Sequence, residues 1–159
     1  MNLIVEPLRA DSFAPYGDVL EAPKEAGRLY FNGSLGSGRA GAAPSLSVVN
    51  VQTLIALPHT ATRMERHEFS SQSFLPLDVE RWLVIVAPKA DHGGPDATKA
   101  RAFLSAHDQG ITYRPDTWHH PLAVLDRPAR FAVFMWLEGS STDEEFVTLD
   151  RPFTVTVPA

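Results

Sequence analysis

Prolines and glycines recur along the whole of this chain and cut its apolar runs to the length of a β-strand. Thirteen prolines and ten glycines are spread over 159 residues. Because both residue types interrupt regular structure and favour turns, the apolar stretches between them are too short for the helices of a bundle. The pattern therefore predicts an all-β chain, mainly β with a few short helices.

The clearest strand candidates are stretches rich in Val, Ile, Phe and Thr. They span residues 46–56, 81–87, 118–125, 130–137 and 153–157. Short helices are expected after Asp11, as an N-cap, and over residues 98–104, where the composition favours a helix. Residues 22–45 contain five glycines and few large apolar side chains, so we expect a long irregular segment that is either a lid over a site or disordered.

The length and net charge of the chain limit which domain organisation and which binding partners are expected. The length fits a single domain, residues 1–159, that buries roughly two-thirds of its unfolded surface. A net charge of −5, with Lys and Arg scattered, argues against nucleic acid or an anionic membrane and favours a small-molecule substrate.

The sequence contains no cysteine, and its first residues do not lead us to expect a secretory signal. The chain has no cysteine, which excludes disulfides, thiolate metal ligands and cysteine nucleophiles and is compatible with a reducing compartment. Residues 1–7 have no basic region, and no window approaches the roughly 20 apolar residues that a membrane span needs. We expect a soluble, cytoplasmic protein.

Three polar residues form the first candidate cluster. Glu65 and His67 are two positions apart, so on a strand their side chains share one face, and Gln72 follows after four spacers. This spacing resembles the first motif of cupin barrels, in which two ligands share a strand and a carboxylate returns from the next one.

Two adjacent histidines form the second cluster, within residues 110–121. On an extended strand only one of His119 and His120 can face a barrel interior. In the second cupin motif the ligand histidine stands five residues after a proline, and Pro115 to His120 matches that spacing, with Thr117 where a glycine is usual. We therefore expect His120 to face inward and His119 to cover the barrel rim.

Together these clusters predict one polar cavity. Two imidazoles with a carboxylate suit Ni, Zn, Mn or Fe. The alternative is a set of hydrogen bonds inside the cavity without metal. No motif for an organic cofactor is present, since the chain has neither a Walker loop nor a Gly-x-Gly-x-x-Gly after a strand. The candidate metal ligands are Glu65, His67, Gln72 and His120.

Other side chains near the clusters could contact a substrate. An arginine fork matches a carboxylate, but Arg66 lies between Glu65 and His67 and should face the other way, which favours a surface salt bridge. Tyr113 and Trp118 are expected in the core or the pocket wall, where either could donate a hydrogen bond. The candidate substrate-binding residues are Arg66, Gln72, Tyr113 and Trp118. The remaining histidines, His59, His92 and His107, stand in segments of loop composition and are expected to be solvated.

Several motifs taken together resemble the ureidoglycolate lyase family. The resemblance runs from residue 1 to about residue 134 and rests on short matching stretches. They are Phe13-Ala14-Pro15-Tyr16-Gly17-Asp18-Val19, Glu65-Arg66-His67, Ser71-Gln72-Ser73-Phe74-x-Pro76, Gly110-x-x-Tyr113 and Trp118-His119-His120-Pro121-Leu122.

The resemblance implies a cupin-like β-barrel, or double-stranded β-sandwich, that acts as a homodimer. It implies cleavage of ureidoglycolate to glyoxylate and urea late in allantoin degradation, a part of purine metabolism, with nickel associated with some members. The chain departs from the family at Met135-Trp136, where an Asp-Arg pair is often found. If that pair holds substrate, this protein would be a paralogue with another ureide or acid substrate.

The implied reaction is that of a carbon–nitrogen lyase of the amidine-lyase type. It requires one base for the hydroxyl proton and one acid for the leaving urea nitrogen, and we assign the catalytic roles to Glu65, His67 and His120. Two alternatives remain open from the residues: a non-catalytic cupin that binds a small ureide or sugar acid, and a different cupin enzyme that uses Fe or Mn.

Overall fold

The chain folds into strands with very little helix, as the proline and glycine pattern predicts. The computed structural model describes residues 1–158. The helical elements are α1 (Ala10–Phe13) and a short 3₁₀ turn (Ala97–Lys99). The strands are β1 (Asn2–Pro7), β2 (Gly17–Leu20), β3 (Ala43–Val51), β4 (His59–Arg66), β5 (Gln72–Asp78), β6 (Trp82–Ala87), β7 (Arg101–Leu104), β8 (Gly110–Tyr113), β9 (Trp118–His119), β10 (Ala123–Val124), β11 (Ala129–Leu137) and β12 (Glu145–Thr156).

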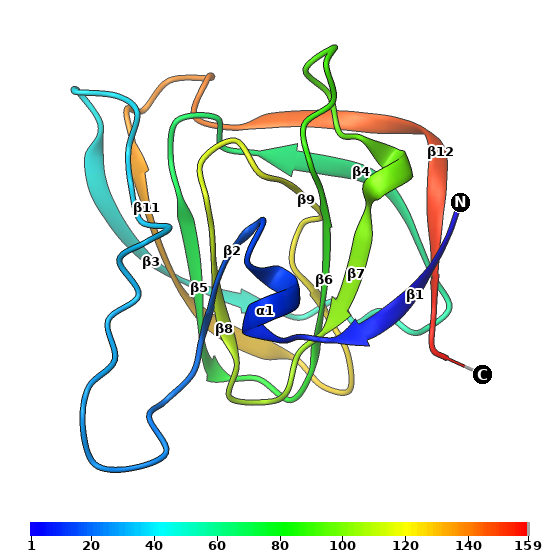
Figure 1. The fold of residues 1–159 in the computed structure, drawn as a ribbon, viewed down its shortest axis with the longest axis horizontal. Coiled ribbons are helices and arrows are strands. Elements are labelled where there is room, and N and C mark those ends of the chain that lie inside the picture. The colour runs from blue at the N-terminus through cyan, green and yellow to red at the C-terminus, as the bar shows by residue number, and fades with distance from the viewer. Residues whose placement is uncertain (159) are drawn as a thin grey trace.

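These strands form two sheets (Figure 1). The larger sheet has the order β10-β6-β7-β1-β12-β4-β9, and β6 also pairs with β9, so the sheet closes into a small barrel. Within it β1 runs parallel to β7 and β12, and the other pairs are antiparallel. The second sheet has the order β2-β8-β5-β11-β3 and is antiparallel throughout. The structure is the all-β, cupin-like architecture expected from the sequence.

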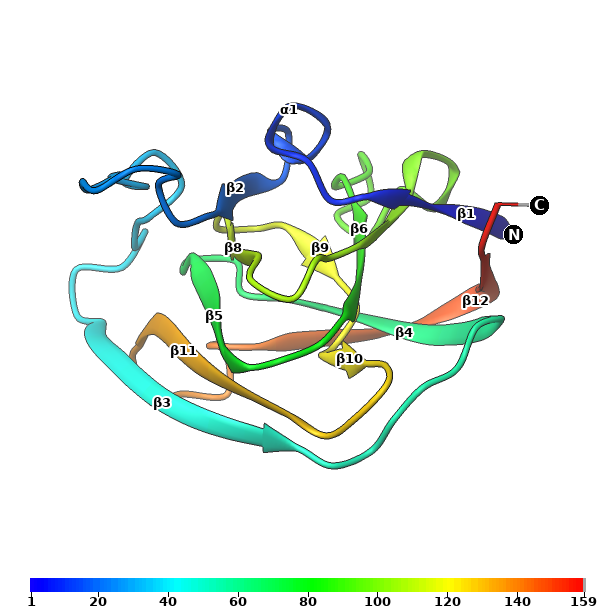
Figure 2. The same cartoon turned by 90° about the horizontal axis from the view of Figure 1, so that it is seen from below.

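Strand β6 separates two apolar cores, because each of its faces is covered (Figure 2). Val84 and Val86 pack with Phe131 of the five-stranded sheet, between the two sheets. Leu83 and Ile85 point the other way, into the core formed by the strands of the small barrel. This double burial explains why β6 reads as a continuous apolar run rather than an alternating one.

Two local predictions are corrected by the structure. Residues 98–104 were expected to form a helix, but a single 3₁₀ turn ends at Lys99 and β7 follows. Strand β7 is bonded on one side to β1 and on the other to β6, and these ladders outweigh the helix propensity of the segment. Residues 118–125 were expected to form one strand and instead form β9 and β10, separated by a stretch that contains Pro121, which cannot donate to a ladder.

The glycine-rich segment between β2 and β3 has no regular element beyond an isolated bridge. Its first part, residues 21–30, is exposed and extends away from both sheets (Figure 1). Its second part returns to the sheets, where Ser37 bridges to Ser70. No helix of the described chain has both the length and the apolar character needed to cross a membrane.

Candidate functional site

Three buried side chains converge on the face of the barrel that meets the five-stranded sheet. Glu65 lies at the end of β4, His67 directly follows that strand, and His119 comes from β9. Each offers a ligand atom, and these atoms all lie within 4.8 Å of one another. Their exposed fractions are 8%, 5% and 1%. This Glu65, His67 and His119 group is called the triad below.

Strand register, and not spacing along the chain, decides which histidine joins the triad. His119 is paired with Glu65 on one side and with Val86 on the other. Residues directly opposite one another in an antiparallel ladder share a face, and Val86 belongs to the core between the sheets. The register therefore places His119, and not the expected His120, beside Glu65, and His119 is buried rather than at the rim.

Hydrogen bonds fix both imidazoles in the same tautomer. His67 Nδ1 lies 2.8 Å from the carbonyl oxygen of Asp143, and His119 Nδ1 lies 2.9 Å from that of Thr117. A carbonyl oxygen only accepts, so Nδ1 carries the proton in each neutral ring and Nε2 presents a lone pair. Both Nε2 atoms are buried and have no hydrogen-bond partner within the described chain.

Charges in the triad favour an ionised carboxylate beside a neutral imidazole. Burial lowers the pKa of His67, and the neighbouring His119 lowers it further. Burial alone would raise the pKa of Glu65, but the nearby histidines, His119 first, outweigh it and leave that pKa lowered. Glu65 Oε1 is 3.3 Å from His119 Nε2, within ion-pair distance but without hydrogen-bond geometry. The triad is thus a buried cluster of Lewis-base atoms of the kind that binds a divalent cation or exchanges a proton.

Gln72 and Tyr113 lie beside the triad on the facing sheet. They are paired across β5 and β8, and both are buried. The ring of Tyr113 stacks on His119 with centroids 4.0 Å apart. Burial, and then the charge of Glu65, raises the pKa of Tyr113 well above its usual value, so its phenol stays protonated. Gln72 Oε1 is buried without a hydrogen-bond partner in the described chain, while its Nε2 meets only Met135 Sδ at 3.9 Å.

Arg66 and Trp118 face away from the triad, because each alternates with a triad residue along its strand. The guanidinium of Arg66 lies over the Trp118 ring, 4.7 Å from its centroid, and pairs with Asp116 and Glu145. Trp118 packs in the core of the small barrel. The expected salt-bridge position of Arg66 is what the structure shows, although its side chain is only 9% exposed.

His59 and His120 form a second imidazole pair next to the triad. Their rings meet edge to face with centroids 5.3 Å apart, and His120 Nδ1 is bonded to the carbonyl of Pro121. Burial lowers the pKa of His120 to about 4. His59 was expected in a solvated loop, but it opens β4 and is half buried. Alternation along β4 does not lead from Glu65 to His59, because Ala61 between them packs with Met64 in the core of the small barrel.

Asp143 and Glu144 lie on the connection between β11 and β12, close to the triad. The carbonyl of Asp143 holds His67, as described above. Burial, and next the charge of Glu65, raises the pKa of Glu144. Nothing in the spacing of these residues pointed to the site.

Comparisons with known proteins agree with this picture. The family model for ureidoglycolate lyase matches residues 1–156. A putative ureidoglycolate lyase of Agrobacterium fabrum is 36% identical over 157 residues, covering 98% of this chain and 96% of that protein. The ureidoglycolate lyase of Brucella melitensis is 38% identical over 162 residues, with 97% and 94% covered.

A solved structure resembles the fold at low sequence identity. The dTDP sugar isomerase of Desulfovibrio desulfuricans G20 superposes with a TM-score of 0.51 and 16% identity, covering 84% of this chain and 83% of that one. At that identity the likeness concerns the fold alone.

Proposed function

Because this chain belongs to the ureidoglycolate lyase family, we propose that it cleaves ureidoglycolate to glyoxylate and urea at the Glu65, His67 and His119 triad. The observation that carries the proposal is the convergence, in one buried cluster, of a carboxylate and two imidazole nitrogens that have no hydrogen-bond partner in the described part of the chain. In the family's pathway this is a late step of allantoin degradation, and the product distinguishes a lyase from a hydrolase: urea, rather than ammonia, leaves with glyoxylate.

The reaction needs one proton to move from oxygen to nitrogen. The carbinol hydroxyl of ureidoglycolate loses its proton as the carbonyl of glyoxylate forms, and the C–N electron pair leaves with the urea nitrogen, which takes up a proton. Glu65, an ionised carboxylate, accepts the hydroxyl proton. His119 Nε2, 3.3 Å from Glu65, is placed to receive this proton from the carboxylate and to deliver it to the leaving urea nitrogen, which restores the ionised carboxylate and the neutral imidazole. Positioned acid–base groups of this kind typically contribute about 10²–10⁴-fold in rate.

The triad also fits the divalent metal that the family implies. Neither Nε2 atom has a hydrogen-bond partner among residues 1–158, and both Nδ1–H groups are held by backbone carbonyls, an arrangement typical of histidine ligands. Glu65, His67 and His119 would hold the ion, with Gln72 Oε1 as a further neutral oxygen. The lone pairs that they would give to the ion could not then accept protons, so the proton relay described above belongs to the ion-free site. Ni is the first candidate, before Zn, Mn or Fe. When bound, such an ion lowers the pKa of a hydroxyl that it contacts and thereby eases its deprotonation.

Gln72 and Tyr113 are the substrate contacts that we propose. Both lie on the triad side, and the protonated phenol and the amide can donate hydrogen bonds to a carboxylate or a urea oxygen. Arg66 and Trp118, which sequence reasoning also proposed, point to the opposite face. His120 pairs with His59 at the edge of the site, and its ring would lower the pKa of Glu65 only in the protonated form.

The proposal is tested by mixing the pure protein with ureidoglycolate and measuring urea, glyoxylate and ammonia against the spontaneous rate. The assay is run after chelation and again with Ni²⁺ or Mn²⁺ added. Urea and glyoxylate should appear in equal amounts, and His67→Gln should lose the activity. His107→Gln, an exposed histidine far from the triad, is the matched control and should keep it. Absence of enzymatic release under every metal condition would reject the lyase function.

The second candidate function is cleavage of a different small acid, and one contact in the structure favours it. Met135, which stands where the family often has an acidic residue, touches the Gln72 amide. Substrate choice at this position would then differ from that of the relatives. Comparing kcat/KM for ureidoglycolate with that for other ureido and hydroxy acids decides between the two candidates.

We also propose that the protein is a cytoplasmic homodimer. The outer face of the five-stranded sheet carries Leu46 and Val48, 71% and 67% exposed, on an edge strand opposite Phe134 and Ala132 of β11. An apolar patch of this kind, bordered at one end by the Arg130–Asp78 ion pair, suits a self-complementary interface with a second copy. Light scattering should give twice the chain mass, and Val48→Asp should give a monomer, whereas Thr60→Asp on β4 should not. A monomeric wild-type protein would reject the dimer, and cell fractionation tests the compartment.

A further inference from the structure

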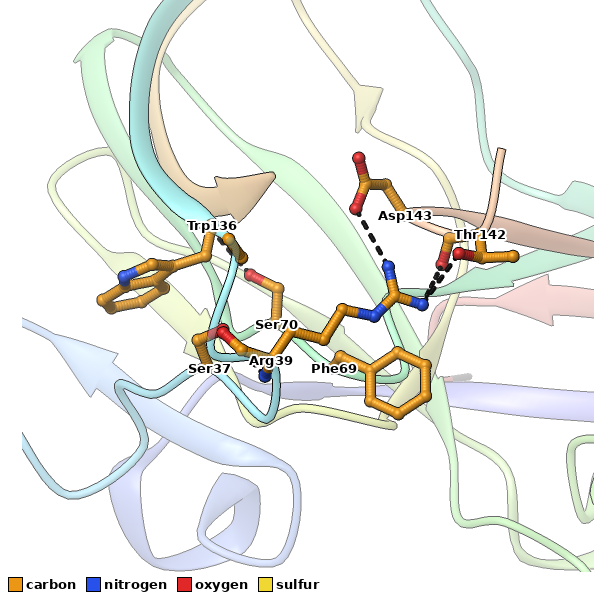
Figure 3. A pocket seen from close by; sticks show the side chains of 8 residues that line it. Ser37, Arg39, Phe69, Ser70, Trp136, Thr142 and Asp143 are labelled. Carbon is orange, nitrogen blue, oxygen red and sulfur yellow. Dashed lines mark hydrogen bonds and ion pairs between the residues drawn. The ribbon is translucent and has the colours of Figure 1, made fainter. Parts of the chain in front are cut away.

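One residue of the glycine-rich segment reaches the connection that holds His67. The side chain of Arg39 donates to Asp143 Oδ1 at 3.4 Å, to Glu138 Oε2 at 3.0 Å and to Thr142 Oγ1 at 2.8 Å. Its guanidinium also lies over the ring of Phe69, 4.1 Å from the centroid. Figure 3 shows Arg39 extended between Phe69 and the pair Thr142 and Asp143.

The connection that Arg39 holds is itself a tight structure built around Asp143. The Asp143 carboxylate accepts hydrogen bonds from the backbone N–H groups of Glu138, Gly139 and Ser140, at 3.0, 2.7 and 3.2 Å. Gly139 has a φ of +88°, a conformation that favours glycine. The backbone carbonyl of the same Asp143 accepts the Nδ1–H of His67 at 2.8 Å. Displacing Asp143 would therefore displace the hydrogen-bond acceptor of a triad residue.

The other end of Arg39 is fixed to the chain next to His67. Gly38 donates its N–H to the carbonyl of Phe69 at 2.7 Å, and Ser71 donates its N–H to the carbonyl of Gly36 at 2.9 Å. Gly36 in turn donates to Ser71 Oγ at 3.1 Å. Phe69 and Ser71 stand two and four positions after His67, in the connection from β4 to β5. Arg39 thus joins two segments that both border His67, and its side chain is only 17% exposed.

We infer that Arg39 is a positioning residue of the lyase site, which acts through Asp143 to hold the His67 ring in its Nδ1-protonated tautomer with Nε2 facing Glu65 and His119. The inference rests on the proposed function for its catalytic consequence, but the tautomer of His67 can be measured without any activity. It also assigns a role to the second half of the segment 22–45, which fastens the wall of the site. Partners in this outer position typically affect metal affinity or activity by about 10–100-fold.

The test compares Arg39→Met, Arg39→Lys and a matched control, Arg81→Met. Methionine keeps an apolar stem over Phe69 but removes the charge, whereas lysine keeps the charge without the fork. Arg81 forms a similar arginine–carboxylate pair, with Asp126, away from the triad. Nitrogen-15 NMR of the imidazole rings, with His67 assigned from His67→Gln, reports the tautomer, and steady-state kinetics report kcat and KM.

In the wild type and in Arg81→Met, His67 should show a single Nδ1–H tautomer with a slowly exchanging proton. In Arg39→Met it should show both tautomers with fast exchange, and kcat should fall about 10–100-fold while KM changes little. Arg39→Lys, which folds with the charge in place, should lie between them. A wild-type tautomer and wild-type kcat in both Arg39 variants would overturn the inference. Absence of turnover in the wild type would reject the proposed lyase activity but not the role of Arg39. The NMR measurement would still decide whether Arg39 holds the His67 ring.

Discussion

His119→Gln should remove most of the stability that a divalent ion gives to this protein, whereas His120→Gln should keep it. The structure assigns one of three converging ligand atoms to His119 and none to His120. For a single site at an ion concentration 100 times Kd, binding stabilises the folded protein by about 2.7 kcal/mol. Loss of a residue that hydrogen-bonds to a ligand typically weakens metal binding by up to about 100-fold, and loss of the ligand itself should weaken it at least as much. The same ion concentration would then only equal Kd, so the stabilisation of the folded protein by the ion would fall to RT ln 2, or about 0.4 kcal/mol.

The assay is thermal unfolding of chelated protein with and without added Ni²⁺. For a domain of this size 1 kcal/mol corresponds to about 2–4 °C, so the wild type should gain about 5–11 °C and His119→Gln only about 1–2 °C. Each variant is compared with its own ion-free form, because His119→Gln also loses the stacking on Tyr113. A full gain in His119→Gln together with a lost gain in His120→Gln would refute the register argument.

Two further predictions concern stability. Ile85→Ala, in a fully buried position of β6, should lower the free energy of unfolding by about 2–5 kcal/mol, as measured by urea titration. Ile4→Ala, at a 61% exposed position, should change it little. Equal losses in the two variants would contradict the assigned core. Asp126→Asn should cost at most about 1 kcal/mol at neutral pH, because its partner Arg81 lowers the pKa of Asp126 and the pair is partly exposed. Because the pKa of Asp126 is lower in the folded than in the unfolded protein, its ion pair stabilises the fold above the unfolded pKa of about 3.9, and this stabilisation is lost as the pH falls through the folded pKa. The wild type and Asp126→Asn should therefore become equally stable in acid. Asparagine tolerates the positive φ of this position, +65°, and a difference that grows toward low pH would contradict the sign.

The fold was predictable from the sequence because its signals are local. Prolines and glycines mark the ends of the strands, and the uninterrupted apolar run of β6 indicates that both of its faces are buried. The helix expected over residues 98–104 shows the limit of such signals, since partners on both sides of β7 come from residues distant in the chain. Local propensity contains no information about those partners.

The site was only partly predictable for the same reason. Alternation along β4 correctly places Glu65 and His67 together and Arg66 on the other face. It cannot tell His119 from His120, because that choice depends on the pairing of β9 with β4 and β6. The contact between Arg39 and Asp143 spans 104 positions of the chain and joins two irregular segments, which no spacing rule predicts.

The most direct test of the account is kcat/KM for ureidoglycolate in Glu65→Gln. The amide keeps the shape of the side chain but cannot accept the hydroxyl proton, so we expect a loss of about 10²–10⁴-fold. Glu144→Gln, which changes a carboxylate close to the triad but outside it, should stay within a few-fold of the wild type. A Glu65→Gln enzyme that cleaves ureidoglycolate at the wild-type rate would contradict the assignment of this chemistry to the triad.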